Sequence, residues 1–265
     1  MRCDRSWFNS QAQPWRNTMT KRNALITGGA RGIGAATAKA LAADGYRVFI
    51  NYVNSAAVAE ALAQEIQNAG GEAYTLKADV RDDAQIQGMF DSIANEHGGV
   101  DVLVSNANMS FTSKPFTEQS WEEFAQKLND EMHAAYQTAK LAVENMKANQ
   151  FGRLIFISST LSEAPAPSFI AHGSAKGALD SFSKYLAQEL GPFGITSNVV
   201  APGLVETDAT KGAPEEFKET IRMFTPTQKI ATPEDVANTV SYLASEKSGH
   251  ITGTYNPVCG GAYLP

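Results

Sequence analysis

The chain has 265 residues, of which 43% are apolar, and its formal net charge is -6. This length suits one large α/β domain with an ample core, and the acidic balance argues against a nucleic-acid partner. No apolar run approaches the roughly 18 residues that a bilayer span requires, so no membrane partner is expected. The two cysteines, Cys3 and Cys259, offer no disulfide framework and predict a cytoplasmic setting.

The N-terminal segment shows neither helical nor strand periodicity. Its aromatic residues Trp7, Phe8 and Trp15 offer contacts to a neighbouring surface, but such a segment at a chain end more often stays mobile. We therefore predict that residues 1–20 are a disordered extension and that residues 21–265 form one folded domain.

From Asn23 onward, short apolar strands alternate with helical stretches. Strands are predicted over residues 23–29, 47–52, 72–80, 100–108, 152–159, 195–203 and 252–261. Helices are predicted over residues 33–45, 56–71, 82–99, 117–149, 170–190 and 233–245, with a short one within 205–230. This alternation predicts a single doubly wound (Rossmann) parallel sheet with helices on both faces. Ligands of such folds bind at the carboxyl ends of the strands.

The first predicted strand runs into "TGGARGIG", residues 27–34, which also opens the first predicted helix. Gly28, Gly32 and Gly34 permit a tight turn, a close approach of backbone to pyrophosphate, and close packing of helix on sheet. The helix N-terminus supplies free N–H groups to an anion. Because the glycines stand between a predicted strand and a predicted helix, they indicate a dinucleotide-binding site.

The end of the second predicted strand bears on the choice of cofactor. An acid there would bind the 2′-hydroxyl of NAD, but this chain has Asn51 and Tyr52. Arg31, inside the glycine loop, can reach a 2′-phosphate unless it is simply a solvated loop charge. The combination favours NADP(H) over NAD.

Further motifs follow the glycine loop in a fixed order: "ADV" at 78–80, "NA" at 106–107, the pair Ser158-Ser159, HxxxK at 172–176 and "APG" at 201–203. With them the chain, from about Lys21 to its end, resembles the short-chain dehydrogenase/reductase family, in particular its NADP-dependent 3-oxoacyl-[acyl-carrier-protein] reductases. The cofactor-binding residues expected from the glycine loop and from this resemblance are Gly28, Arg31, Gly32, Ile33, Gly34, Asn51, Tyr52, Asp79, Val80, Asn106, Ala107, Lys176, Pro202, Gly203, Val205 and Thr207.

The resemblance also implies a catalytic set. A serine orients the substrate carbonyl, a tyrosine exchanges the proton, a lysine binds the nicotinamide ribose, and an asparagine on the long helix holds a water. Ser159 and Lys176 match the serine and the lysine. The tyrosine is replaced by His172, and Glu131 aligns with the asparagine, although Asn129 is close enough to leave that assignment open.

Three interpretations of His172 follow. It is a working acid, base or polarising group; or it binds substrate in a reaction that needs no tyrosine, such as reduction of an activated double bond; or it marks an NADP-binding protein without turnover. Tyr136 and Tyr185 lack the spacing to replace a side chain one helical turn before Lys176.

The charge state of His172 depends on its neighbours. A lysine one turn away disfavours an imidazolium. If Glu131 lies near Lys176, its carboxylate would offset the lysine charge and permit a protonated His172; otherwise Glu131 is only a helix-face acid. The expected function is NADPH-dependent reduction of a carbonyl in a small-molecule or carrier-bound acyl substrate, such as a β-ketoacyl thioester. No metal-ligand spacing occurs among the histidines, and the resemblance implies a homodimer or homotetramer formed through the long helices.

Overall fold

The computed structural model describes residues 21–264, so the predicted extension over residues 1–20 lies outside the described residues. Seven parallel strands form one sheet in the order β3-β2-β1-β4-β5-β6-β7. The strands are β1 (Asn23–Ile26), β2 (Arg47–Tyr52), β3 (Glu72–Lys77), β4 (Val102–Ser105), β5 (Gly152–Ile157), β6 (Ile195–Pro202) and β7 (Tyr255–Val258). The strand order reverses between β1 and β4, which is where doubly wound folds bind their ligands.

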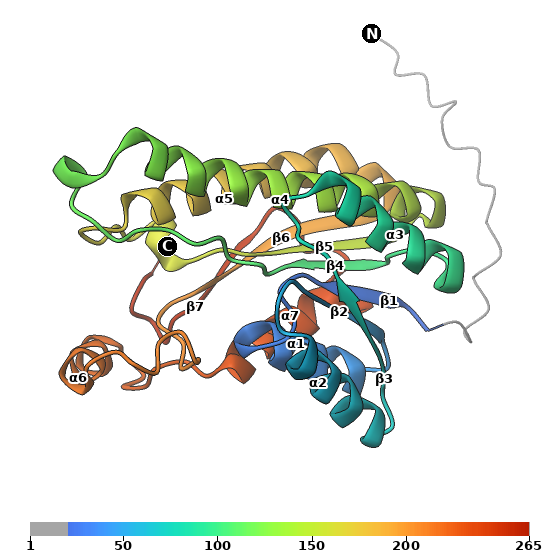
Figure 1. Ribbon diagram of the computed structural model, residues 1–265, viewed down its shortest axis with the longest axis horizontal. Coiled ribbons are helices and arrows are strands. Elements are labelled where there is room, and N and C mark those ends of the chain that lie inside the picture. Colours follow the sequence, from blue (N-terminus) through green and yellow to red (C-terminus); the bar gives the residue numbers. More distant parts are fainter. Residues whose placement is uncertain (1–20, 265) are drawn as a thin grey trace, which may run out of the picture.

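Helices cover both faces of the sheet. Figure 1 shows α3, α4 and α5 on one face and α1, α2 and α7 on the other. Their bounds are α1 (Gly32–Ala43), α2 (Ala56–Asn68), α3 (Asp83–His97), α4 (Trp121–Asn149), α5 (Ile170–Leu190) and α7 (Pro233–Ala244). The structure therefore confirms the predicted doubly wound fold. None of the helices within residues 21–264 is long and apolar enough to cross a membrane.

Two apolar cores lie on opposite faces of the sheet, because successive side chains of a strand point to opposite faces. In β1, Ala24 and Ile26 enter the core beneath α1, α2 and α7, whereas Leu25 enters the core beneath α3, α4 and α5. All residues of β1, β5 and β6 are buried. These strands therefore lack a solvent-exposed face, as a sheet covered on both sides requires.

The predicted element boundaries differ from the structure mainly at turns. The predicted strand 23–29 included the glycine turn, but β1 ends at Ile26. The long helix begins at Trp121 rather than at residue 117, because Ser120 caps it: the Ser120 side chain accepts from Glu123 N–H, and the Glu123 side chain accepts from Ser120 N–H. Residues Phe116–Glu118 form a separate 3₁₀ turn.

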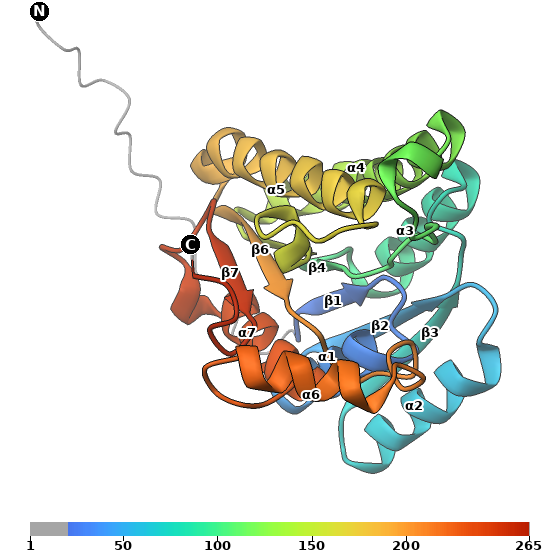
Figure 2. The same cartoon turned by 90° about the vertical axis from the view of Figure 1, so that its left-hand side faces the viewer.

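The short helix α6 (Glu215–Phe224) lies apart from both helical layers in Figure 1 and in front of α1 in Figure 2. It belongs to a long excursion that begins after β6. An isolated β-bridge joins Val205 to Ala231 at the base of this excursion, and Glu206 N–H donates to the Ala231 carbonyl over 2.9 Å. The bridge closes the segment and leaves α6 beside the glycine loop rather than on the sheet, where it shares a cavity with Gly32 and Thr207.

Asn51, near the end of β2, is hydrogen-bonded to the glycine loop. Its Oδ1 accepts from Gly28 N–H over 3.2 Å, its backbone carbonyl accepts from Gly29 N–H over 2.8 Å, and its Nδ2 donates to the Ala78 carbonyl over 2.9 Å. The residue is only 1% exposed. Its amide thus joins the glycine loop to the residues at the end of β3, and its neighbour Tyr52 is partly exposed.

Replacing Asn51 with leucine should loosen the loop. The change keeps the volume but leaves Gly28 N–H and the Ala78 carbonyl without their partner, at a cost of about 1–3 kcal/mol for each buried group. We expect a lower urea midpoint and weaker NADPH binding, measured by denaturation and by cofactor fluorescence. The exposed neighbour variant Asn54→Leu is the control. Equal stability and affinity in the two variants would contradict this role.

Candidate active site

The glycine loop, residues 27–34, encloses a space that side chains in place of its glycines would occupy. A Cβ atom on Gly34 would lie 2.6 Å from the Gly28 carbonyl oxygen and 2.7 Å from Nδ2 of Asn106. Gly28 and Gly32 have φ angles of 60° and 51°, which favour glycine. Helix α1 starts without a side-chain cap at Arg31, so its first N–H groups remain available to an anion. These features fit a bound pyrophosphate.

Asn106 joins the glycine loop to the end of β4. Its Nδ2 donates to the carbonyls of Thr27 over 2.9 Å and of Gly28 over 3.1 Å. Thr27 Oγ1 in turn accepts from the N–H groups of Asn106 and Ala107. The two predicted residues therefore lie at the crevice between β1 and β4. Their contacts in the structure are to the loop that would bind the cofactor.

Other predicted cofactor residues surround this crevice. Arg31 is exposed, and within residues 21–264 it pairs with no carboxylate. Thr207 approaches Gly32, with 3.3 Å between its Cγ2 and a Cβ built on the glycine. The carboxylate of Asp79 is engaged by Arg81 over 2.6 Å, and this hydrogen bond lowers the pKa of Asp79. The remaining predicted residues lie in α1, after β3, or at and after the end of β6: Ile33, Val80, Pro202, Gly203 and Val205.

A buried carboxylate lies at the centre of the predicted catalytic set. Glu131 is 3% exposed, its Oε1 is 2.5 Å from Nζ of Lys176, and its Oε2 is 2.6 Å from Nζ of Lys127. Burial alone would raise the pKa of Glu131, but the two ammonium groups reverse this and lower the pKa to about 2. Asn129, the alternative residue, is exposed. Glu131 therefore occupies the position beside the lysine.

Lys127 is a site residue that the sequence analysis missed. Its side chain is fully buried, and besides Glu131 its Nζ donates to Asn108 Oδ1 and to the Met109 carbonyl, each over 2.7 Å. All three of its donor hydrogens are thus used. Burial lowers the pKa of Lys127, although Glu131 opposes that effect. The i, i+4 spacing of Lys127 and Glu131 on α4 is the one sequence signal that could have found this pair.

His172 is held as a neutral imidazole. It is 8% exposed, and burial, reinforced by Lys176 and Lys127, lowers its pKa from 6.5 to about 3 against the opposing effect of Glu131. Two ammonium groups and one carboxylate leave an excess positive charge around the ring. The expected imidazolium is therefore not favoured, because burial and the two lysines together lower the pKa of His172 by more than Glu131 raises it.

No hydrogen bond orients the His172 ring through Nδ1. This atom is buried, and it has no hydrogen-bond partner among residues 21–264. The ring of Phe111 stacks on the imidazole instead, with centroids 4.7 Å apart and planes inclined by 24°. Phe111 lies in the loop after β4, which carries no pattern that predicts this contact.

Ser159 follows β5 and caps the 3₁₀ turn η2 (Thr160–Ser162): its Oγ accepts from Leu161 N–H over 3.2 Å. The hydroxyl hydrogen is free to be donated elsewhere. The carbonyl of Ser159 accepts from Ser162 Oγ over 2.9 Å and from the Tyr255 hydroxyl over 3.3 Å. The structure thus fixes the backbone of Ser159, and within the described residues it shows no hydrogen bond between Ser159 and His172.

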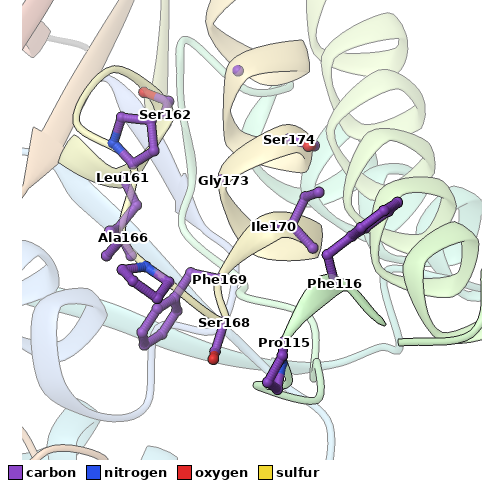
Figure 3. A pocket seen from close by; sticks show the side chains of 13 residues that line it. Pro115, Phe116, Leu161, Ser162, Ala166, Ser168, Phe169, Ile170, Gly173 and Ser174 are labelled. Atoms are coloured by element: carbon purple, nitrogen blue, oxygen red, sulfur yellow. The ribbon is translucent and has the colours of Figure 1, made fainter. Parts of the chain in front are cut away.

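A cavity of about 670 Å³ opens beside the loop 161–170 and the start of α5 (Figure 3). It includes Phe116, Phe169, Ile170, Gly173 and Ser174 but neither His172 nor Lys176. Ile170, Gly173, Ser174 and Gly177 share one face of α5, whereas His172 and Lys176 share a buried face. This cavity therefore lies on the other side of α5 from the catalytic candidates.

The pKa of His172 has a consequence for stability. The unfolded chain binds a proton at its ordinary pKa of 6.5, whereas the folded protein binds it only near pH 3. Stability is therefore present above pH 6.5 and is lost as the pH falls, by about 2 kcal/mol between pH 7 and 5. Urea denaturation of His172→Gln should show a shallower loss than the wild type. The exposed-histidine variant His250→Gln should behave like the wild type; equal slopes in all three would contradict a neutral buried imidazole.

Comparison with known proteins agrees with this geometry. The family described as Enoyl-(Acyl carrier protein) reductase matches residues 28–263. The chain is 33% identical to the 3-oxoacyl-[acyl-carrier-protein] reductase FabG of Staphylococcus aureus over 248 residues, which cover 93% of this chain and 99% of the relative. It is 34% identical to the 3-oxoacyl-[acyl-carrier-protein] reductase MabA of Mycobacterium tuberculosis over 240 residues, 91% of this chain and 92% of the relative.

A solved structure gives the same result. YwfH, an NADPH-dependent reductase involved in bacilysin biosynthesis, matches with a TM-score of 0.87 and 27% identity, and the match covers 93% of this chain and 100% of YwfH. Family, relatives and fold coincide over the region that holds the glycine loop, Ser159 and Lys176. The chain belongs to the short-chain dehydrogenase/reductase family.

Proposed function

We propose that this oxidoreductase is an NADP(H)-dependent reductase of a carbonyl compound, with Ser159 and His172 at the substrate oxygen and Lys176 at the nicotinamide ribose. The observation that carries the proposal is the hydrogen bonding of Lys176. Its Nζ donates to Glu131 over 2.5 Å and to the Ile157 carbonyl over 2.8 Å. One of its three hydrogens remains for a ribose hydroxyl, one helical turn from His172.

The cofactor side of the proposal rests on the glycine loop and on Arg31. No acid follows β2 in the ribose position, and Arg31 is an exposed cation at the start of α1 that pairs with no carboxylate of residues 21–264. This charge pattern favours a 2′-phosphate. When bound, NADPH supplies the hydride. Asp79, Val80, Asn106 and Ala107 at one end, and Pro202, Gly203, Val205 and Thr207 at the other, are the further contacts that we expect.

The substrate side rests on a neutral His172. A neutral imidazole donates one hydrogen bond, and such donors polarise carbonyl groups in enzymes. The excess positive charge from Lys127 and Lys176 stabilises an oxyanion beside the ring. It also makes the N–H a better acid, because loss of its proton leaves an anion next to two cations. Ser159 supplies a second donor.

The same charge state favours one alternative. Reduction of a double bond conjugated to a carbonyl develops an enolate oxygen, which needs hydrogen-bond donors but no proton on oxygen. A neutral His172 suffices for that reaction. The matching family, described as Enoyl-(Acyl carrier protein) reductase, is consistent with it, whereas the relatives FabG and MabA are named 3-oxoacyl-[acyl-carrier-protein] reductases.

We also expect a homodimer or homotetramer and a cytoplasmic setting. The long helices α4 and α5 expose Trp121, Tyr136 and Tyr185, at 70%, 50% and 68% of their surface. Such aromatic residues are enriched at protein interfaces. A carrier-bound acyl group is the expected form of the substrate, because both relatives are named for it.

The decisive assay follows NADPH oxidation with a β-ketoacyl thioester and with the matching α,β-unsaturated thioester. His172→Ala should lower kcat about 100-fold or more on the true substrate, since it removes one donor to the developing oxyanion. Lys140→Met, at an exposed lysine of α4, is the control that should retain activity.

The outcomes separate the candidate functions. Turnover of the ketone identifies a carbonyl reductase, and turnover of the conjugated thioester alone identifies the alternative. Tight NADPH binding without turnover of either substrate, with ketone reduction gained in His172→Tyr, would show that the protein binds the cofactor but has lost the chemistry.

Arg31 provides a separate prediction about the cofactor. Replacing Arg31 with alanine removes the proposed partner of the 2′-phosphate, and charge-assisted hydrogen bonds of this kind contribute about 1.5–3 kcal/mol. We expect the Kd for NADPH to rise about 10- to 100-fold while that for NADH changes little. A fluorescence titration with both cofactors measures this, and equal weakening of the two would exclude a 2′-phosphate contact.

A further inference from the structure

A catalytic histidine needs a group that fixes the orientation of its ring. In many enzymes the second ring nitrogen is hydrogen-bonded to a carboxylate or carbonyl for this purpose. In this protein Nδ1 of His172 is buried, and within residues 21–264 it has no such partner. The ring contact that the structure does provide is the face of Phe111, 4.7 Å away and nearly parallel.

The stacking of Phe111 on His172 can fix the orientation of the imidazole ring. A hydrogen bond to an imidazole nitrogen lies in the plane of the ring, whereas Phe111 covers one face. The phenyl ring therefore restricts rotation of the imidazole without occupying the direction along which a substrate oxygen approaches. Phe169 also contacts Phe111, with ring centroids 6.0 Å apart and planes inclined by 55°.

The loop that carries Phe111 is anchored to the catalytic ion pairs. Lys127 Nζ binds Asn108 Oδ1 and the Met109 carbonyl, each over 2.7 Å, and Glu131 Oε2 accepts from Met109 N–H over 3.2 Å. Two residues beyond Phe111, Ser113 Oγ donates to the Ser168 carbonyl over 3.2 Å. Phe111 is thus held between two fixed points, one on α4 and one in the segment before α5.

We propose that Phe111 is the positioning residue of His172, and that Lys127 and Glu131 hold it there through the side chain of Asn108 and the backbone of Met109. The role rests on the proposed function of His172. In this proposal the buried Lys127 also has a structural role. Its ammonium group links the loop after β4 to Glu131, the carboxylate that also binds Lys176.

The test compares Phe111→Leu, which keeps apolar volume but removes the ring, with Phe111→Tyr, which keeps the stack. Aromatic pairs of this kind are worth enough to change a rate about three- to tenfold. We expect Phe111→Leu to lower kcat by that factor with the KM for NADPH unchanged, and Phe111→Tyr to stay within about twofold of the wild type. Tyr242→Leu, on α7, is the matched control.

A pH profile separates positioning from a purely structural role. The charged groups that face His172 are Lys176 on its own helix and Lys127 and Glu131 on α4. Without the phenyl ring, water reaches the imidazole, so the pH profile of kcat for Phe111→Leu should show an inflection at a higher pH than that of the wild type. A flat profile and full activity in Phe111→Leu, alongside an inactive His172→Ala, would overturn the proposal and leave the proposed function standing.

A second measurement needs no substrate. The phenyl ring current should shift the imidazole proton resonances of His172 upfield in the wild type and in Phe111→Tyr but not in Phe111→Leu. Unshifted resonances in the wild type would overturn the stacking role even if the protein has no turnover. Shifted resonances together with absent turnover would instead disprove the proposed function alone.

Discussion

The site depends on one buried carboxylate shared by two lysines. Glu131 binds Lys176 and Lys127 through different oxygens and is 3% exposed. Burying three ionic groups is costly unless their hydrogen bonds are satisfied, and here each ammonium group also donates to a backbone carbonyl. Removing Glu131 would leave two uncompensated cations in the core. The arrangement therefore fixes Lys176, the loop after β4 and the field around His172 together.

The electrostatic field of these three groups contributes to the charge state of His172. With a single lysine and a single carboxylate the local charges would cancel, and burial alone would decide the protonation of His172. The second lysine leaves one positive charge in excess, which acts in the same direction as burial and keeps the imidazole neutral. A neutral donor in a positive field stabilises negative charge on a substrate oxygen. His172, Glu131 and Lys127 are thus parts of one electrostatic arrangement.

Much of the fold could be predicted from sequence because it depends on local signals. Apolar runs with flanking glycines predicted the strands, and helical periodicity predicted α5 over its full extent. The glycine loop was predictable because steric limits leave few residues that fit. The residues that were missed depend on tertiary contacts. Lys127 looks like a surface lysine until α4 is packed against the loop after β4, and Asp180, one turn beyond Lys176, is buried as well.

The charge state of His172 could not be predicted from the sequence either. It depends on burial and on the charges of Lys176, Lys127 and Glu131, not on spacing along one helix. We infer that this balance keeps His172 an uncharged hydrogen-bond donor. An NMR titration of its imidazole resonances in the NADP⁺-bound protein tests this inference. We expect no protonation of His172 between pH 8 and pH 5. A titration midpoint at or above the ordinary pKa of 6.5 would show that the ring carries a proton in the working enzyme and would contradict this inference.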